Sequence, residues 1–178
     1  MKKSESRNVS VIRDTDGNKI VFINDVIFKG KRTICWNDVE DYLKKHVGEF
    51  YTIAETNETI FLGDDLPDEY AHSEYSARVK GAYAKAKANA AQGLGEMLEI
   101  AYNCHFKSNN KDKHKCDGAN GWYRYESRFA LPVYTNDGEV EKYNFYHVYM
   151  IIRHDINGKK YLYDLINIRK ETSTPLSC

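Results

Sequence analysis

The sequence has little of what marks a secreted or membrane protein. Only three of its 178 residues are proline and four are cysteine. The four cysteines, Cys35, Cys104, Cys116 and Cys178, do not show the paired spacing of a disulfide framework. The first ten residues lack the apolar segment of a secretory signal, and no apolar run approaches the about 18 residues of a membrane span. We therefore expect a soluble protein of the bacterial cytoplasm, without membrane contact.

The sequence also lacks net charge, since 26 basic residues balance 26 acidic ones. A dedicated DNA-binding domain is usually more basic, so any nucleic-acid contact must come from a local basic patch. Hydrophobic residues make up 42% of the chain, which is typical of a globular protein. Tyrosine is abundant, with 14 copies. Tyrosine suits half-exposed sheet faces and stacking surfaces.

The N-terminal third predicts hairpins and one short helix. Segments rich in β-branched and aromatic residues are separated by turn residues and predict two hairpins, 9–13 with 19–23 and 50–53 with 59–62. A helix is predicted from Asp38 to Gly48, with Asn37 as its cap. The acidic segment 63–73 lacks periodicity and indicates a boundary. We expect three parts: a flexible tail (1–8), a β-hairpin and helix subdomain (9–66) and a main domain (67–178).

The main domain predicts one long helix followed by an antiparallel meander. Apolar residues at spacings of three and four run from Glu74 to about Asn103 and favour a helix, although Gly93 and Gly95 weaken it. A lysine-rich loop is predicted at 104–121. Strands are predicted at 122–134, 141–154 and 160–169, joined by Asn-Gly and Asp-Gly turns. The fold class expected is therefore α+β.

Alternation along the predicted strands separates an apolar face from a polar one. The polar face collects Glu126, Arg128, His147, Arg153 and Tyr163. A sheet packed on one side has a polar outer face, so these side chains can be solvent-facing decoration. The alternative is a phosphodiester site, because arginine binds phosphate in a bidentate manner, histidine shuttles protons and tyrosine stacks on bases.

Other polar residues leave similar alternatives open. A polar stripe on the predicted helix consists of Lys85, Asn89, Gln92 and Glu96. This stripe is either a solvent-exposed face of the helix or a row of hydrogen-bonding side chains beside a ligand groove. Asp164 interrupts an apolar strand face and must be paired with a cation if it is buried. His154 is expected to be a buried, hydrogen-bonded core residue.

Four long segments of the chain resemble a known family: KAKANAAQGLGEMLEIA (85–101), GWYRYESRFALPVY (121–134), YNFYHVYMIIRHD (143–155) and GKKYLYDLINIRKETSTPL (158–176). Together with residues 16–43 they resemble a large polyvalent protein-associated domain of phages and conjugative elements. That family is assigned to the barnase–EndoU–colicin–RelE-like nuclease superfamily. The resemblance implies one or two helices followed by an antiparallel sheet of about four strands.

The resemblance also implies an activity and its residues. It implies importance for Lys85, Lys87, Asn89, His114, Arg128, Arg153, His154, Asp164 and Lys170. Metal-independent RNA cleavage needs a base, an acid and a cation. The catalytic candidates are His147, Arg128, His114, Glu126 and Lys85. The candidates for substrate binding are Lys87, Asn89, Arg124, Arg153, His154, Tyr163 and Lys170.

Cys104, His105, His114 and Cys116 could be read as a zinc site, but their spacing is not the usual one, so we expect neither metal nor cofactor. Three functions follow as hypotheses. The first is a mobile-element RNase-like toxin or processing protein that acts on RNA. The second is a catalytically inactive anti-defence protein that binds an immunity or host defence protein, for which the tyrosines and the neutral charge are suited. The third is a structural accessory of a phage particle or a conjugation machine.

Overall fold

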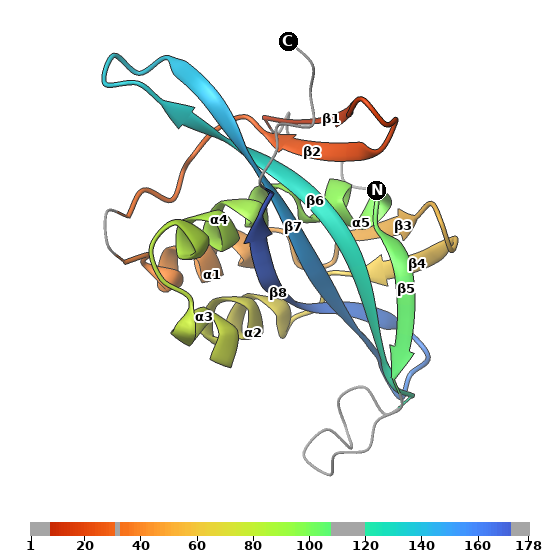
Figure 1. Cartoon of the computed structure of the whole chain (residues 1–178). Helices are drawn as coiled ribbons and strands as arrows, with labels where there is room; N and C mark the ends of the chain where they lie inside the picture. Colours follow the sequence, from red (N-terminus) through yellow and green to blue (C-terminus); the bar gives the residue numbers. More distant parts are fainter. Residues whose placement is uncertain (1–7, 31–32, 108–119, 172–178) are drawn as a thin grey trace.

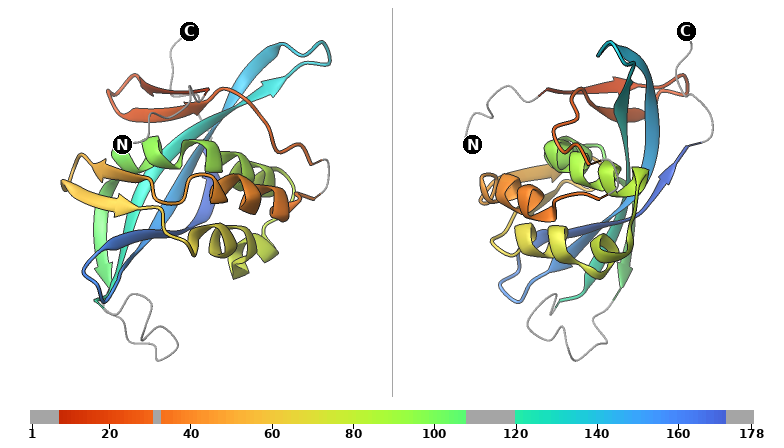
Figure 2. Two further views of the ribbon diagram at one scale, coloured as in Figure 1. Left: turned by 180° about the vertical axis from the view of Figure 1, so that it is seen from behind. Right: turned by 90° about the vertical axis from the view of Figure 1, so that its left-hand side faces the viewer.

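The computed structural model describes residues 8–30, 33–107 and 120–171. They form one curled sheet with the helices on its inner side (Figures 1 and 2). The strands are β1 (Val9–Arg13), β2 (Lys19–Ile23), β3 (Phe50–Ile53), β4 (Glu58–Phe61), β5 (Tyr102–Lys107), β6 (Trp122–Tyr134), β7 (Val140–His154) and β8 (Lys160–Lys170). Their order across the sheet is β1-β2-β6-β7-β8-β4-β3, and β5 also pairs with β6.

The sheet is mixed, which corrects the predicted fold class. β6, β7 and β8 pair antiparallel in chain order, but β2 joins β6 and β4 joins β8 in parallel. Residues 9–66 and 67–178, predicted as two domains, therefore share one sheet and one hydrophobic core. More of the described residues lie in strands than in helices. The prediction of a long helix followed by an antiparallel meander is wrong.

The predicted helix over 74–103 is instead several short ones. The helices of the chain are α1 (Trp36–Lys44), α2 (Leu66–His72), α3 (Glu74–Arg78), α4 (Ala82–Ala90), the 3-10 turn η1 (Ala91–Gly93) and α5 (Leu94–Glu99). Val79 is extended and Gly81 has φ 60°, a conformation that only glycine adopts readily, so the chain turns between α3 and α4. The residues after α5 continue into β5 rather than into a loop.

The segment predicted as a domain boundary forms α2, with Pro67 in its first turn, where a missing N–H costs nothing. The helix predicted from Asp38 begins two residues earlier, at Trp36. Cys35 is at its N-cap, and no side chain caps it. None of the helices in the described ranges is long and apolar enough to span a membrane.

Two glycines allow the helices to approach the sheet closely. A Cβ on Gly95 would lie 2.1 Å from the Tyr51 ring, and one on Gly93 would lie 3.2 Å from Val21. The helices thus fill the concave side of the sheet, where Phe129, Val148 and Leu165 are buried. The opposite faces of β6 and β7 look outward and carry the polar side chains.

Candidate active site on the outer face of the sheet

Strand register brings two rows of functional side chains together on the outer face. In one row Tyr102 of β5 pairs with Glu126 of β6, which pairs with Tyr149 of β7. In the next row Arg128 of β6 pairs with His147 of β7, which pairs with Arg169 of β8. Directly opposite residues of antiparallel strands project to the same side, about 5 Å apart.

Glu126 and His147 form a hydrogen-bonded pair at the centre of these rows. His147 Nε2 lies 2.7 Å from Glu126 Oε1, and both side chains are half-buried, at 23% and 18% exposure. Asn103 donates its side-chain amide to the other carboxylate oxygen. Burial acts to raise the pKa of Glu126, but the hydrogen bonds from Asn103 and His147 outweigh it and lower the pKa. Glu126 is therefore an ionised acceptor that orients the imidazole of His147.

Irregular backbone flanks this pair on both sides. Asn103 and Asn167 have positive φ, at 58° and 51°, although neither is glycine. The β5–β6 register shifts between Tyr102 and His105, and the β7–β8 register shifts between His147 and Tyr149. Bulges of this kind redirect side chains, and non-glycine residues with positive φ concentrate at functional sites.

Arg128 is held by two carboxylates. Its Nε and Nη2 donate to the two carboxylate oxygens of Glu171 at 2.7 and 2.9 Å, and its Nη1 donates to Asp14 at 2.8 Å. The hydrogen bond to Glu171, reinforced by Asp14, raises the pKa of Arg128. Three of the five guanidinium N–H groups are thus used by the two carboxylates, and the edge formed by Nε and Nη2 is occupied by Glu171.

A cleft of about 460 Å³ opens beside Arg128, between the β1–β2 turn and the start of β5. Arg128 and Tyr102 line one side, and Arg13, Asp16 and Lys19 line the other. Asp14 stiffens the turn, because its carboxylate accepts the backbone N–H groups of Asp16 and Asn18, each at 2.9 Å. The cleft can hold a group the size of a nucleotide, and its lining residues Arg128 and Tyr102 are the cross-strand neighbours of His147 and Glu126.

Two further guanidinium groups lie near the pair. Arg124 lies over the ring of Tyr149, 4.5 Å from its centre. Arg169, exposed at the end of β8, is in register with His147. Together with Arg128 they balance the carboxylates of Asp14, Glu126 and Glu171, so the site has cations at its edges without a strong net charge.

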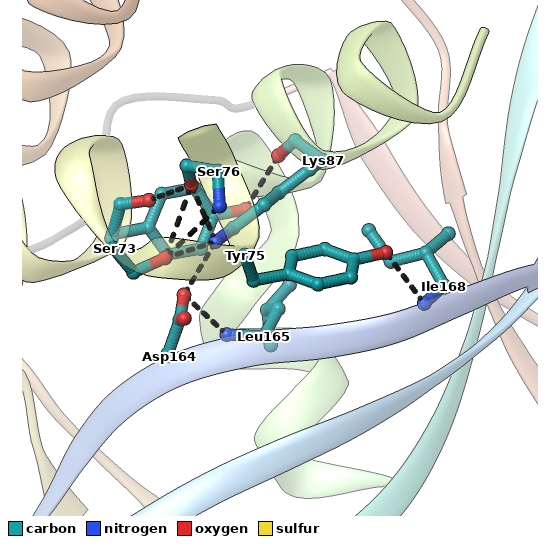
Figure 3. Close-up of polar contacts among 8 residues, drawn as sticks. Ser73, Tyr75, Ser76, Lys87, Asp164, Leu165 and Ile168 are labelled. Atoms are coloured by element: carbon teal, nitrogen blue, oxygen red, sulfur yellow. Dashed lines mark hydrogen bonds and ion pairs between the residues drawn. The ribbon is translucent and has the colours of Figure 1, made fainter. Parts of the chain in front are cut away.

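A second polar cluster lies inside the protein (Figure 3). Lys87 of α4 is fully buried, and its amine donates to Asp164 of β8 at 2.5 Å and to Ser76 at 2.7 Å. It also lies against the rings of Tyr70 and Tyr75. Burial lowers the pKa of Lys87 against the pull of Asp164, and burial raises the pKa of Asp164. Asp164 thus has the cationic partner expected of it.

This buried cluster ties α2, α3 and α4 to β8 and does not face solvent. Lys87 and Asn89, predicted to bind substrate, are each 0% exposed. Asn89 accepts the backbone N–H groups of Ile27 and Phe28 at 3.0 and 3.1 Å. Gln92 donates to the carbonyl of Asp25 at 3.0 Å. Asn89 and Gln92 of the predicted polar stripe therefore bind the chain's own segment 25–28 instead of a ligand groove.

The remaining predicted site residues lie away from the Glu126–His147 pair. Arg153 is buried and bonds to Asp65 at 3.0 Å, with its guanidinium over the Tyr161 ring. Tyr163 packs edge-on against Trp122. His154 Nε2 donates to the Gly158 carbonyl, 3.2 Å away, and the residue is only partly buried, so it is hydrogen-bonded as expected but not a core residue.

Lys85 lines a separate hollow with Asp25 and Lys29, and Lys170 is exposed at the end of β8. His114 lies outside the described residues, as does Cys116. Cys104 is a free, exposed thiol. Among the described residues, Glu40, Asp68 and His72 place possible ligand atoms within 4.8 Å of one another, but Glu40 and His72 bond to each other at 3.1 Å.

Sequence reasoning missed several members of the site: Asp14, Tyr102, Asn103, Tyr149, Arg169 and Glu171. Alternation along the strands puts Tyr149 and Arg169 on the polar face, but it does not give the register that sets Tyr149 opposite Glu126 and Arg169 opposite His147. Asp14 and Glu171 come from segments far apart in the sequence, and no local pattern links them to Arg128. No family model matches the chain, and no curated protein or solved structure matches it either.

Proposed function

We propose that this protein cleaves RNA without a metal ion, with His147 as the proton-transfer group and Glu126 as the carboxylate that orients it. The observation that carries this proposal is the 2.7 Å bond between His147 and Glu126, whose cross-strand neighbours Arg128 and Tyr102 line a nucleotide-sized cleft. A histidine fixed by an ionised carboxylate is a common general base near neutral pH. The outer-face rows supply the other groups that such a reaction needs.

The reaction is an internal transesterification of RNA. His147 removes the proton from a 2′-hydroxyl, and the 2′-oxygen attacks the adjacent phosphorus while the bond to the 5′-oxygen breaks. The proton held by His147 then passes to the departing 5′-oxygen, and a 2′,3′-cyclic phosphate is left. Glu126 stabilises the intermediate imidazolium, and Arg124 and Arg169 stabilise the charge on the phosphorane. Tyr102 and Tyr149 offer rings on which bases stack.

The sequence resemblance to a nuclease superfamily of phages and conjugative elements supports the same proposal. It adds the biological setting of a toxin or processing protein carried by a mobile element. The residues that we assign to the reaction differ in part from those that the resemblance implies. Lys87, Asn89 and Asp164 make buried hydrogen bonds, whereas Glu126 and His147 carry out the proposed proton transfer.

The test is incubation of the purified protein with total RNA and with tRNA in excess EDTA. We expect fragments that end in 2′,3′-cyclic phosphate, and we expect an oligonucleotide with a single 2′-deoxy substitution to resist cleavage at that position. Intact RNA at high protein concentration would overturn the proposal. That result would favour a binding protein whose tyrosine-rich face contacts an immunity or host defence protein.

A further inference from the structure

The structure assigns to Arg128 a phosphate-binding position that Glu171 occupies in the resting protein. This inference rests on the proposed function and concerns how the same site is filled. A guanidinium that presents its Nε and Nη2 edge to two oxygens is the arrangement in which arginine binds phosphate. Here the two oxygens are those of the Glu171 carboxylate, at 2.7 and 2.9 Å.

The two carboxylates on Arg128 are not equivalent. Asp14 is only 4% exposed, and its other oxygen accepts two backbone N–H groups of the β1–β2 turn, so it is a fixed part of the framework. Glu171 is 22% exposed and follows the last residue of β8. Among the described residues, the side chain of Glu171 hydrogen-bonds to Arg128. Glu171 is therefore the carboxylate that can leave without disturbing a turn.

The surroundings of Arg128 favour a nucleotide phosphate as the replacement. Arg128 lines the cleft and is the cross-strand neighbour of His147, so a phosphate bound to its guanidinium would lie on the same face of the sheet as the proton-transfer group. Removal of Glu171 leaves Arg128 with one carboxylate instead of two, so the position becomes more favourable for an anion. The ligand is thus a phosphate group that displaces Glu171 from Arg128.

Titration with inorganic phosphate tests this directly, with binding followed through the NMR signal of the Arg128 Hε. Wild type is expected to bind weakly, and Glu171→Gln about tenfold more tightly, with the Arg128 signal shifting in both. Glu171→Asp, which keeps the charge, should bind no more tightly than wild type. Glu141→Gln, which removes the same charge from the exposed far end of β7, is the matched control and should behave as wild type.

Equal phosphate affinity in wild type and Glu171→Gln would overturn the inference, as would a phosphate response that leaves the Arg128 signal unchanged. Thermal unfolding of each variant confirms that the fold is retained. The titration does not depend on RNA cleavage. Tighter phosphate binding by Glu171→Gln without cleavage would contradict the proposed function and leave the phosphate position in place.

Discussion

The chemistry proposed for the outer face depends on how individual side chains position one another. His147 has its imidazole fixed by Glu126, and Glu126 is in turn fixed by Asn103. Each link uses a residue from a different strand, β7, β6 and β5. A site built in this way loses its geometry when any one link is removed, even if the imidazole itself remains.

The link from Asn103 predicts a change in the titration of Glu126. Burial raises the pKa of Glu126 and the hydrogen bonds from Asn103 and His147 lower it, with a net decrease. We expect Asn103→Gly, which keeps the positive φ of 58°, to move the pKa of Glu126 upward. NMR titration of the Glu126 carboxyl carbon measures this.

The same shift sets a pH window for stability. A carboxyl whose pKa is depressed in the folded state contributes stability above its unfolded pKa, and this is lost as the pH falls through the folded value. The difference in free energy of unfolding between wild type and Asn103→Gly should thus be largest near neutral pH and shrink in acid. A difference that stays constant from pH 7 to pH 3 would contradict the role given to Asn103.

At the scale of secondary structure, the sequence was informative for strands and misleading for the helices. The hairpin turns with Asp-Gly and Asn-Gly predicted β1–β2, β6–β7 and β7–β8 closely, because those turns need local residues only. The long helix failed because the apolar spacing over 74–103 continues through two breaks. The breaks lie at Val79–Gly81, between α3 and α4, and at Gly93, between α4 and α5, and their effect depends on what the helices pack against.

The site could be predicted only in part for a related reason. Alternation correctly placed Glu126, Arg128 and His147 on one face, since side-chain direction in a strand has a period of two. Lys87 and Asn89 were assigned to substrate binding although they are buried. The sequence pattern of a polar residue in a helix is the same whether that residue contacts solvent, a ligand or buried backbone. The parallel pairing of β2 with β6 and of β4 with β8 is non-local and leaves no sequence signal.

Close packing of α5 on the sheet predicts a marked cost for a small change. Gly95→Ala would place a methyl group 2.1 Å from the Tyr51 ring, whereas Gly93→Ala would place one 3.2 Å from Val21. We expect Gly95→Ala to lower the free energy of unfolding by about 1–3 kcal/mol, because the ring or the helix must move. Gly93→Ala is the matched control and should cost less in the same urea titration. The reverse order would contradict the described packing of α5.

At the scale of the whole molecule, the buried Lys87–Asp164 pair joins the helices to the sheet. Lys87→Met leaves the Asp164 carboxylate buried without a cation, and we expect a loss of about 3–5 kcal/mol in the free energy of unfolding. The double variant Lys87→Met with Asp164→Leu removes both charges and should recover most of that loss. Urea unfolding of the single and double variants measures both values. If the single variant cost under about 1 kcal/mol, the pair would not be the structural link described.

The central claim is that the Glu126–His147 pair on the outer face of this sheet cleaves RNA. The most direct measurement compares wild type, His147→Ala and His154→Ala on one RNA in excess EDTA. His154 is the matched control, because it is also partly buried on β7 but its imidazole hydrogen-bonds to the Gly158 carbonyl, where that of His147 bonds to a carboxylate. We predict cleavage by wild type and by His154→Ala, and a loss of at least about a hundredfold in rate for His147→Ala. Equal rates for His147→Ala and wild type, or no cleavage by any of the three, would contradict the account.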